Sequence, residues 1–330
     1  MEVKSRKIDE LNQELTIVVA AGDYAEAEKK KLNARRRTAE FKGFRKGMVP
    51  ASLIQKVYGD QCLAEAVNEV VSDQIQKYLD ESGIHILGEP LSSEKQPELE
   101  WKSGNEFTFV FDLGLSPEVS VEAEKSDEIV KYDISVSAAE KKKAVEGLKK
   151  YYTDKKEEKT DDDIEKEVSE RLDGQYRQES DWRVSRDIRD YFVGKAGLKL
   201  PEDFLKRWLI YANEGKVSKE DIEKEFPGFI EDFKWQMVRG SLIRKWDVKI
   251  EQKDIEDAAN AYVAYQYAMY GMGNVPEAVI KDAAANLLKD RKQVENLVER
   301  VEDEKVMSKI RETVTFKAKK ITSEKYRELK

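Results

Sequence analysis

The most informative stretch of this chain is Phe41-Lys42-Gly43-Phe44-Arg45-Lys46-Gly47-Met48-Val49-Pro50. Its two glycines can adopt positive φ angles at little cost, and its proline has the φ angle that starts a helix. The segment is therefore predicted to form a tight, exposed loop whose tip offers one aromatic ring and two cations to a partner. The alternative is an ordinary turn in which Phe44 folds back onto the core.

Positive charge gathers around this loop, although the chain as a whole has a formal net charge of −8. Residues 23–59 contain ten Lys or Arg and four Asp or Glu, a local charge of +6, so the remainder carries −14. A basic surface on an acidic protein indicates a binding site for a negatively charged partner. RNA phosphate, or a protein site surrounded by RNA, is the expected partner. The alternative is a solvated helix face. The predicted basic patch comprises Lys29, Lys30, Lys31, Arg35, Arg36, Arg37, Lys42, Arg45 and Lys46.

The first 115 residues are predicted to form an α+β domain. Residues 3–8 and 14–20 read as strands, because apolar side chains alternate along the second of them at the strand period. A helix is expected from Asp23 to about Glu40, and an amphipathic helix from residue 63 to about Gly83. Alternating phenylalanines in residues 106–113 indicate a third strand. Strands on either side of helices favour an α+β fold.

Residues 116–163 read as a connector. Residues 116–137 have the composition of an extended segment, and the capping-box pattern Ser137-Ala138-Ala139-Glu140 opens a helix to about Tyr152. Residues 153–163 are charged and contain no large apolar side chain, which is typical of a linker or of the solvated ends of two helices.

Residues 164–330 are predicted to form an elongated all-α domain, so that the whole chain is multidomain and mostly helical. Pro201, Asp254 and Pro276 each open a helical pattern, and Gly271 to Asn274 break one. Trp208, Trp235 and Trp246 are expected in the core.

One segment of this helical part, residues 262–272, is apolar or aromatic nearly all round its helix. A helix in a thin bundle cannot bury every side, and Met and aromatic side chains can adapt to varied partners. The candidate residues for binding unfolded polypeptides are Tyr262, Tyr265, Tyr267, Met269, Tyr270 and Met272. The alternative is that the tyrosines fill the core and the seams between helices.

The sequence contains no recognisable catalytic constellation. No phosphate-binding glycine loop occurs, and the chain has one histidine, His85, and one cysteine, Cys62, which lie far apart in sequence. We therefore expect no enzyme activity, no cofactor and no multi-cysteine metal site. No apolar run is long enough to cross a membrane, and the N-terminus lacks an apolar signal core, so the cytoplasm is the expected compartment.

The glycine-framed segment, Gly43-Phe44-Arg45-Lys46-Gly47-x-x-Pro50, resembles the ribosome-docking signature of trigger factor, the bacterial ribosome-associated chaperone. Other matching stretches cover nearly the whole chain. They are Val57-Tyr58-Gly59, Ile86-Leu87-Gly88-Glu89-Pro90, Phe109-Val110-Phe111-Asp112, Ser116-Pro117-Glu118-Val119, Asn274-Val275-Pro276-Glu277 and Asn296-Leu297-Val298-Glu299-Arg300. The helical part of the resemblance is less specific, since amphipathic helices resemble one another.

The resemblance implies an ATP-independent chaperone that docks at the ribosomal exit tunnel and holds unfolded nascent chains. Its partners would be a large-subunit protein beside the exit and the adjacent RNA, with Phe44 in an apolar niche and Arg45 and Lys46 on acidic groups. Dimerisation away from the ribosome is expected to cover exposed apolar surface.

The family usually carries an FK506-binding-type prolyl isomerase domain, a fold that needs on the order of 100 residues. The corresponding place in this chain is the charged stretch of residues 153–163, so no isomerase activity is expected. Two other functions stay open: an RNA-binding protein that uses the basic helix from Lys29 to Arg37, and a holding chaperone unrelated to the ribosome, such as a periplasmic one.

Overall fold

The structure, a computed structural model, describes residues 1–214 and 216–329 and divides into two compact units. The N-terminal unit comprises Met1–Glu118 and Lys199–Phe229, and the C-terminal unit comprises Val119–Leu198 and Ile230–Lys330. This division differs from the predicted boundaries in two ways. Residues 199–229 join the N-terminal unit rather than the helical part, and the connector from residue 119 belongs to the C-terminal unit.

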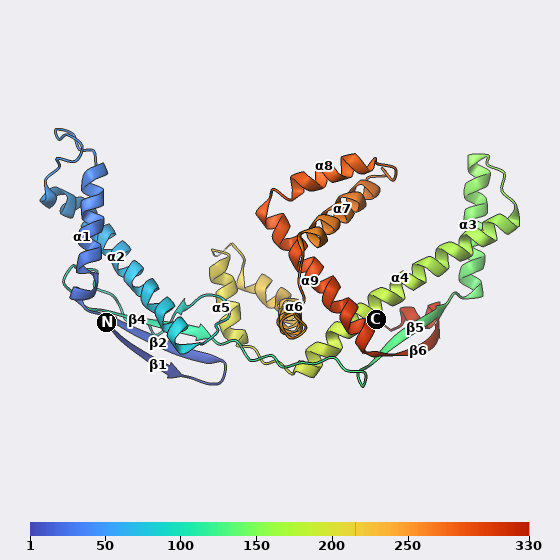
Figure 1. Cartoon of the computed structure of the whole chain (residues 1–330), viewed down its shortest axis with the longest axis horizontal. Helices are drawn as coiled ribbons and strands as arrows, with labels where there is room; N and C mark the ends of the chain where they lie inside the picture. The colour runs from blue at the N-terminus through green and yellow to red at the C-terminus, as the bar shows by residue number, and fades with distance from the viewer. Residues whose placement is uncertain (215, 330) are drawn as a thin grey trace. The chain divides into compact units, whose positions relative to one another are not determined.

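A four-stranded antiparallel sheet forms the base of the N-terminal unit (Figure 1). Its strands lie in the order β1-β2-β4-β3, with β2 paired to both β1 and β4. The predicted strands and the α+β class are confirmed. The elements of this unit are β1 (Glu2–Lys7), β2 (Asn12–Val19), α1 (Ala21–Thr38), α2 (Ala51–Ser82), β3 (Leu91–Ser92), β4 (Phe107–Gly114) and α5 (Glu202–Ala212).

One face of this sheet carries the core of the N-terminal unit. Every second residue of β2 is buried, and each pairs with a phenylalanine or leucine of β4 on the same face. The helix α2 is continuous over 32 residues and begins at Ala51, well before the start expected at residue 63, because Gly59 is buried inside the helix and does not break it. The core residues are Leu15, Ile17, Val19, Tyr24, Leu63, Val67, Val71, Phe107, Phe109 and Leu113.

The C-terminal unit is mostly helical, as predicted, but it also contains a two-stranded parallel sheet that the sequence did not suggest. Strand β6 pairs with β5, from Glu128 opposite Thr315 to Ser135 opposite Thr322. The remaining elements are β5 (Glu128–Ser135), α3 (Ala138–Lys155), α4 (Asp161–Ala196), α6 (Lys219–Lys245), α7 (Gln252–Met269), α8 (Glu277–Leu287), α9 (Arg291–Thr313), β6 (Thr315–Thr322) and α10 (Ser323–Arg327), with α6 beginning in the N-terminal unit.

Helix α4 packs against several other elements of this unit, because its row of buried residues winds around the helix. Buried residues recur every four positions, and four residues turn an α-helix by about 40° more than one full turn. The row therefore meets α3 first, then β5, where Ser180 Oγ donates to the Tyr132 carbonyl at 2.6 Å, and finally α6 and α9. Its members are Ile164, Val168, Leu172, Tyr176, Ser180, Val184, Ile188 and Phe192.

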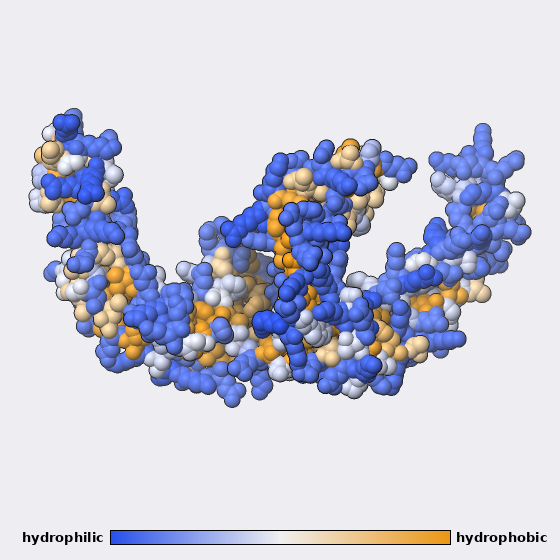
Figure 2. Space-filling view, viewed as in Figure 1, coloured by the Kyte–Doolittle hydropathy of each residue, from blue (hydrophilic) through white to orange (hydrophobic). Residues whose placement is uncertain are grey.

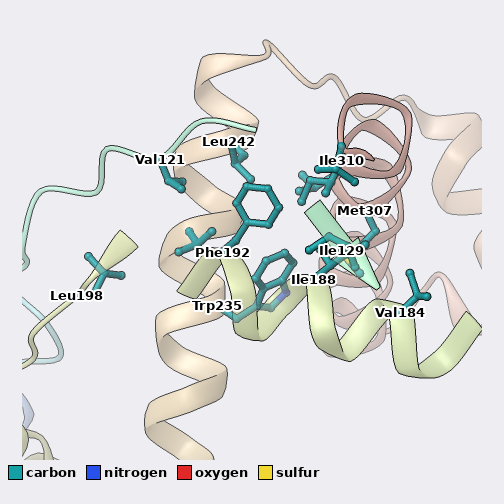
Figure 3. Packing of buried hydrophobic residues seen from close by; sticks show 13 residues of the cluster. Val121, Ile129, Val184, Ile188, Phe192, Leu198, Trp235, Leu242, Met307 and Ile310 are labelled. Carbon is teal, nitrogen blue, oxygen red and sulfur yellow. The ribbon is translucent and has the colours of Figure 1, made fainter. Parts of the chain in front are cut away.

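Aromatic rings fill the core where α4, α6 and α9 meet (Figure 3). Phe192 and Trp235 are almost fully buried there, which confirms Trp235 as a core residue. The Trp235 indole N–H donates to Asp303 Oδ1 at 2.6 Å, and Arg189 donates to the other oxygen of the same carboxylate at 2.7 Å. The Trp235 indole and the Asp303 carboxylate are therefore hydrogen-bonded to each other, as stable interiors require of buried polar groups.

Candidate functional site

Two consecutive tight turns form the glycine-framed loop between α1 and α2. The Phe44 amide donates to the Phe41 carbonyl at 3.0 Å, and the Met48 amide donates to the Arg45 carbonyl at 2.9 Å. Gly43 and Gly47 occupy the third position of these turns with φ angles of 93° and 81°. A positive φ at that position defines a type II turn and favours glycine. The predicted reason for the two glycines is confirmed.

The base of the loop is fixed by a small apolar cluster. Val49 and Ile54 are buried in it, and the Phe41 ring packs edge-on against Tyr58, with centroids 6.2 Å apart. The Arg36 Nε–H group donates to the Val49 carbonyl at 2.9 Å. The ends of the loop are thus anchored while the tip has no apolar support.

The tip itself projects into solvent. Phe44 is 44% exposed and Met48 is 68% exposed, so Phe44 does not fold back onto the core. Arg45 has no ion pair with any residue that the structure describes. Lys46 Nζ lies 3.6 Å from Glu40 Oε1, and both side chains are more than half exposed, so this pair contributes little. The exposed Met48 was not among the predicted site residues, although its place directly after Gly47 could have indicated it.

The predicted basic patch separates into two groups, and the first group is structural. Arg35 donates to Glu65 of α2 at 2.9 Å and lies over the Tyr58 ring, and Lys31 pairs with Glu69. The hydrogen bond from Arg35 lowers the pKa of the Glu65 carboxyl, and the bond from Lys31 does the same for the pKa of Glu69. With Arg36 on the Val49 carbonyl, these three cations bind α1 to its neighbours.

The second group of cations is free to meet a partner. Lys29 and Arg37, together with Lys30, lie at helical spacing along one exposed face of α1 and line a shallow groove of about 590 Å³ with Asn33. None of the three cations forms an ion pair within the described part of the chain, and the same holds for Lys42. The free positive charge therefore lies on α1 and in the loop that follows it.

The second candidate region lies at the connection of α7 and α8. Tyr262 and Tyr267 pack against the buried residues Ala259, Val263, Ala284 and Leu297, so the alternative reading, interhelix packing, holds for these two tyrosines. The Tyr262 hydroxyl also accepts a hydrogen bond from Gln266 Nε2 at 2.7 Å. These two residues support the hairpin formed by α7 and α8 and do not offer a free surface.

The other four candidate residues are exposed. Tyr265 is 63% exposed, Met269 70%, Tyr270 80% and Met272 49%. Residues 258–276 contain no charged side chain, in a chain that is 38% charged. Hydrophobic residues reach the surface of α7 and α8 in Figure 2. We call this surface, formed by Tyr265, Met269, Tyr270 and Met272, the hairpin tip.

The remaining chemistry-bearing residues form no site. Cys62 is buried, and burial raises the pKa of its thiol, so it is not activated as a nucleophile. No group of His, Cys, Asp and Glu among the described residues could hold a metal ion. No described helix is long and apolar enough to cross a membrane. Trp208 and Trp246, which were expected in the core, are partly buried, and Trp246 packs against the core formed by α4, α6 and α9.

Comparison with known proteins gives a consistent family assignment. The family model of the bacterial trigger factor protein matches residues 1–148, and that of the probable trigger factor C-terminal domain matches residues 180–330. The trigger factor of Jannaschia sp. (strain CCS1) is 31% identical over 148 residues, which cover 45% of this chain and 33% of that protein. The trigger factor of Azospirillum brasilense is 24% identical over 281 residues, 84% of this chain and 61% of that protein.

The fold comparison agrees with the sequence comparison. A solved structure, from work on promiscuous substrate recognition in the folding and assembly activities of the trigger factor chaperone, matches with a TM-score of 0.52. The match covers 94% of this chain and 99% of that chain at 14% identity, which shows the fold alone. The chain spans between a third and about three-fifths of the length of the two relatives named above.

Proposed function

Because this chain belongs to the trigger factor family, we propose that it is an ATP-independent chaperone of the cytoplasm that docks on the large ribosomal subunit and holds unfolded nascent chains. The docking proposal rests on the exposed tip of the loop between α1 and α2. Phe44 is exposed and Arg45 has no intramolecular ion pair among the described residues, while the base of the same loop is anchored.

Docking would use both kinds of group at the tip. Burial of one phenylalanine side chain in an apolar niche supplies about 2–3 kcal/mol. The Arg45 guanidinium can donate two parallel hydrogen bonds to a carboxylate or phosphate, and Lys46 can leave its weak pair with Glu40 at small cost. The free cations of α1 would steer the approach toward RNA beside that niche.

Holding would use the hairpin tip. Its four side chains are exposed, and Met and Tyr side chains can repack against different partners. A surface of this kind fits a chaperone whose clients share apolar segments but no common sequence. Holding by apolar contact needs no chemical step, so the proposed function requires no nucleotide.

We further propose that the chain has no prolyl isomerase activity. Helix α3 ends at Lys155 and α4 begins at Asp161, so only residues 156–160 lie between them. A domain with its own core needs many more residues, on the order of 50 at least. A protease-coupled proline isomerisation assay should detect no turnover, and turnover at the rate of an isomerase would refute this proposal.

The docking proposal is tested by cosedimentation with purified ribosomes. The loop variant, with Phe44→Ala, Arg45→Ala and Lys46→Ala, should lose at least about 100-fold in affinity, since an aromatic and an arginine are the residues that dominate interfaces. A matched control is Trp182→Ala with Arg186→Ala, because Trp182 is 64% exposed and Arg186 lies 5.5 Å from its ring centroid.

Three outcomes of this experiment are informative. Loss of binding by the loop variant alone, with urea unfolding unchanged, supports docking through the tip. Equal binding by the loop variant and wild type contradicts it. Competition by free RNA at the same affinity as ribosomes would favour the alternative, an RNA-binding protein.

A further inference from the structure

Exposure divides the six methionines of this chain into two groups. Met307 is buried, and Met237 packs against the same core, where α4, α6 and α9 meet. The exposed methionines are Met1, Met48, Met269 and Met272. Two of these four, Met269 and Met272, lie close together in sequence on the hairpin tip. This surface therefore carries two thioether side chains that are open to solvent.

The backbone around these two methionines is fixed by the way in which α7 ends. The Gly271 amide donates to the Ala268 carbonyl at 3.0 Å, and the Met272 amide donates to the Tyr267 carbonyl at 2.9 Å. With Gly271 at a φ angle of 78°, this pattern is a Schellman motif. Both hydrogen bonds join backbone groups, so neither uses a methionine side chain. Chemistry at the sulfur atoms therefore leaves the backbone of the tip in place.

The space around the turn after α7 is open. A Cβ atom on Gly271 or Gly273 would meet no heavy atom within 4 Å other than those of its chain neighbours. Met269 is 70% exposed, and the adjacent Tyr270 is 80% exposed. A small oxidant can therefore reach the sulfur atoms of the tip, and so can the active site of an enzyme that reverses their oxidation.

No reactive thiol of this chain competes for an oxidant. Cysteine reacts as its thiolate, and the only cysteine, Cys62, is buried. Burial also raises the pKa of its thiol, so the thiolate is disfavoured at neutral pH. Mild oxidation of this chain should therefore fall on its exposed methionines.

Oxidation turns an apolar contact residue into a polar one. The sulfur lone pair attacks one oxygen of hydrogen peroxide, and an S–O bond forms as the O–O bond breaks. The proton of the transferred oxygen moves to the departing hydroxide, which leaves as water, and the thioether becomes a sulfoxide. A sulfoxide oxygen pressed against an apolar client segment would lose its hydrogen bonds to water. Residues 258–276 contain no cation that could donate to it instead.

We propose that Met269 and Met272 form a redox-sensitive modification site, at which oxidation by a peroxide to the sulfoxides lowers the affinity of the hairpin tip for clients. The inference rests on the proposed holding function and adds its regulation. Methionine sulfoxide reductases reverse the change, since they remove the oxygen as water while a dithiol is oxidised to a disulfide. Holding would then follow the redox state of the compartment without loss of the fold.

The test measures the affinity for an unfolded client that lacks methionine and cysteine, by fluorescence anisotropy. Each form of the full chain is measured before and after treatment with hydrogen peroxide, which is removed before the client is added. One variant combines Met269→Leu with Met272→Leu, which removes both sulfur atoms and keeps apolar side chains of similar volume. The matched control is Met48→Leu, because Met48 is about as exposed as Met269 but lies outside the tip. Since each form is compared with itself, differences in basal affinity between forms do not enter.

Peroxide should lower the client affinity of wild type and of Met48→Leu about tenfold, and that of the double leucine variant less than about twofold. A sulfoxide reductase with dithiothreitol should restore the affinity of wild type. Peptide mass spectrometry should find Met269 and Met272 oxidised before Met237 and Met307, because the last two pack in the core. The urea unfolding midpoint should not change at the dose of peroxide that oxidises the tip.

The possible failures are distinguishable. If both methionines of the tip are oxidised and the client affinity of wild type stays the same, the modification site is refuted and the holding function stands. An equal loss by the double leucine variant would place the effect at other residues and would also refute the site. If untreated wild type does not bind the client, the holding function is refuted, and the regulation proposed for it falls with it.

Discussion

The glycine-framed loop of residues 41–50, which we call the docking loop after its proposed role, and the hairpin tip both expose large apolar side chains, but their electrostatic surroundings differ. Phe44 lies between cations, with Arg45 free and more positive charge on the adjacent face of α1. The hairpin tip lies in a stretch of 19 residues, 258–276, without any charge. In the proposed function these exposed apolar residues serve different purposes. Those beside cations would recognise one fixed partner, and those without charge would accept many.

The two surfaces also differ in how their backbone is held. The loop has both ends anchored and both glycines at positive φ, so its tip is presented in one geometry. The hairpin tip spans the C-terminal end of α7 and the turn after it, where Gly271 has a φ angle of 78°, and its four side chains are exposed. Preorganisation favours specific docking, whereas adaptable side chains favour promiscuous holding.

Salt gives the largest expected contrast between the two surfaces. If about four cations of α1 and the loop release counterions from RNA, ribosome affinity should fall on the order of 100-fold between 50 mM and 200 mM salt. Affinity for an uncharged apolar client should change little over the same range, because the hairpin tip has no charge to screen. Ribosome cosedimentation and client anisotropy at several salt concentrations measure both slopes, and equal slopes would remove the distinction.

Loss of the hairpin tip should have the next largest effect. The tip variant, with Tyr265→Ala, Met269→Ala and Tyr270→Ala, should bind an unfolded client about 30-fold more weakly, because three exposed contact residues are lost. Alanine favours the helix, so stability should not fall. Suppression of aggregation of a denatured protein, without nucleotide, measures holding. The Trp182→Ala variant is the control, and a loss of holding equal to that of the tip variant would show that any exposed aromatic residue serves.

The smallest expected effects come from single substitutions in the two groups of cations on α1. Arg37→Gln should weaken ribosome binding about fivefold and leave the urea midpoint unchanged, since Arg37 has no ion pair within the described residues. Arg35→Gln should lower the urea midpoint, because Arg35 holds Glu65 and covers Tyr58. If Arg35→Gln alone weakens ribosome binding, then the structural and the free cations have been assigned the wrong way round.

Local rules were sufficient to predict the docking loop. Gly43 and Gly47 permit a positive φ angle and Pro50 has the φ angle that starts a helix, so the two turns follow from the order of residues. The exposure of Phe44 needed the structure, because the sequence also allowed a turn in which this ring folds back onto the core. The same rules could not sort the basic patch. Whether Lys31 or Lys30 is free depends on which face of α1 meets Glu65 and Glu69 of α2, and that is a property of the helix pair.

Contacts between residues far apart in the sequence could not be predicted from local patterns. Strand β6 pairs with β5, which lies more than 180 residues earlier, and its three lysines hide the strand pattern. The place of α5 on the N-terminal sheet depends on Gly88 and Gly114, which give no local sign that Trp208 and Phe204 will occupy the space above them.

The most direct test of this account is cosedimentation of the loop variant and the tip variant with ribosomes, side by side. The tip variant should pellet with ribosomes as wild type does, while the loop variant should stay in the supernatant. Pelleting of the loop variant at the wild-type level, or equal loss by both variants, would contradict the claim that docking and holding lie on separate surfaces.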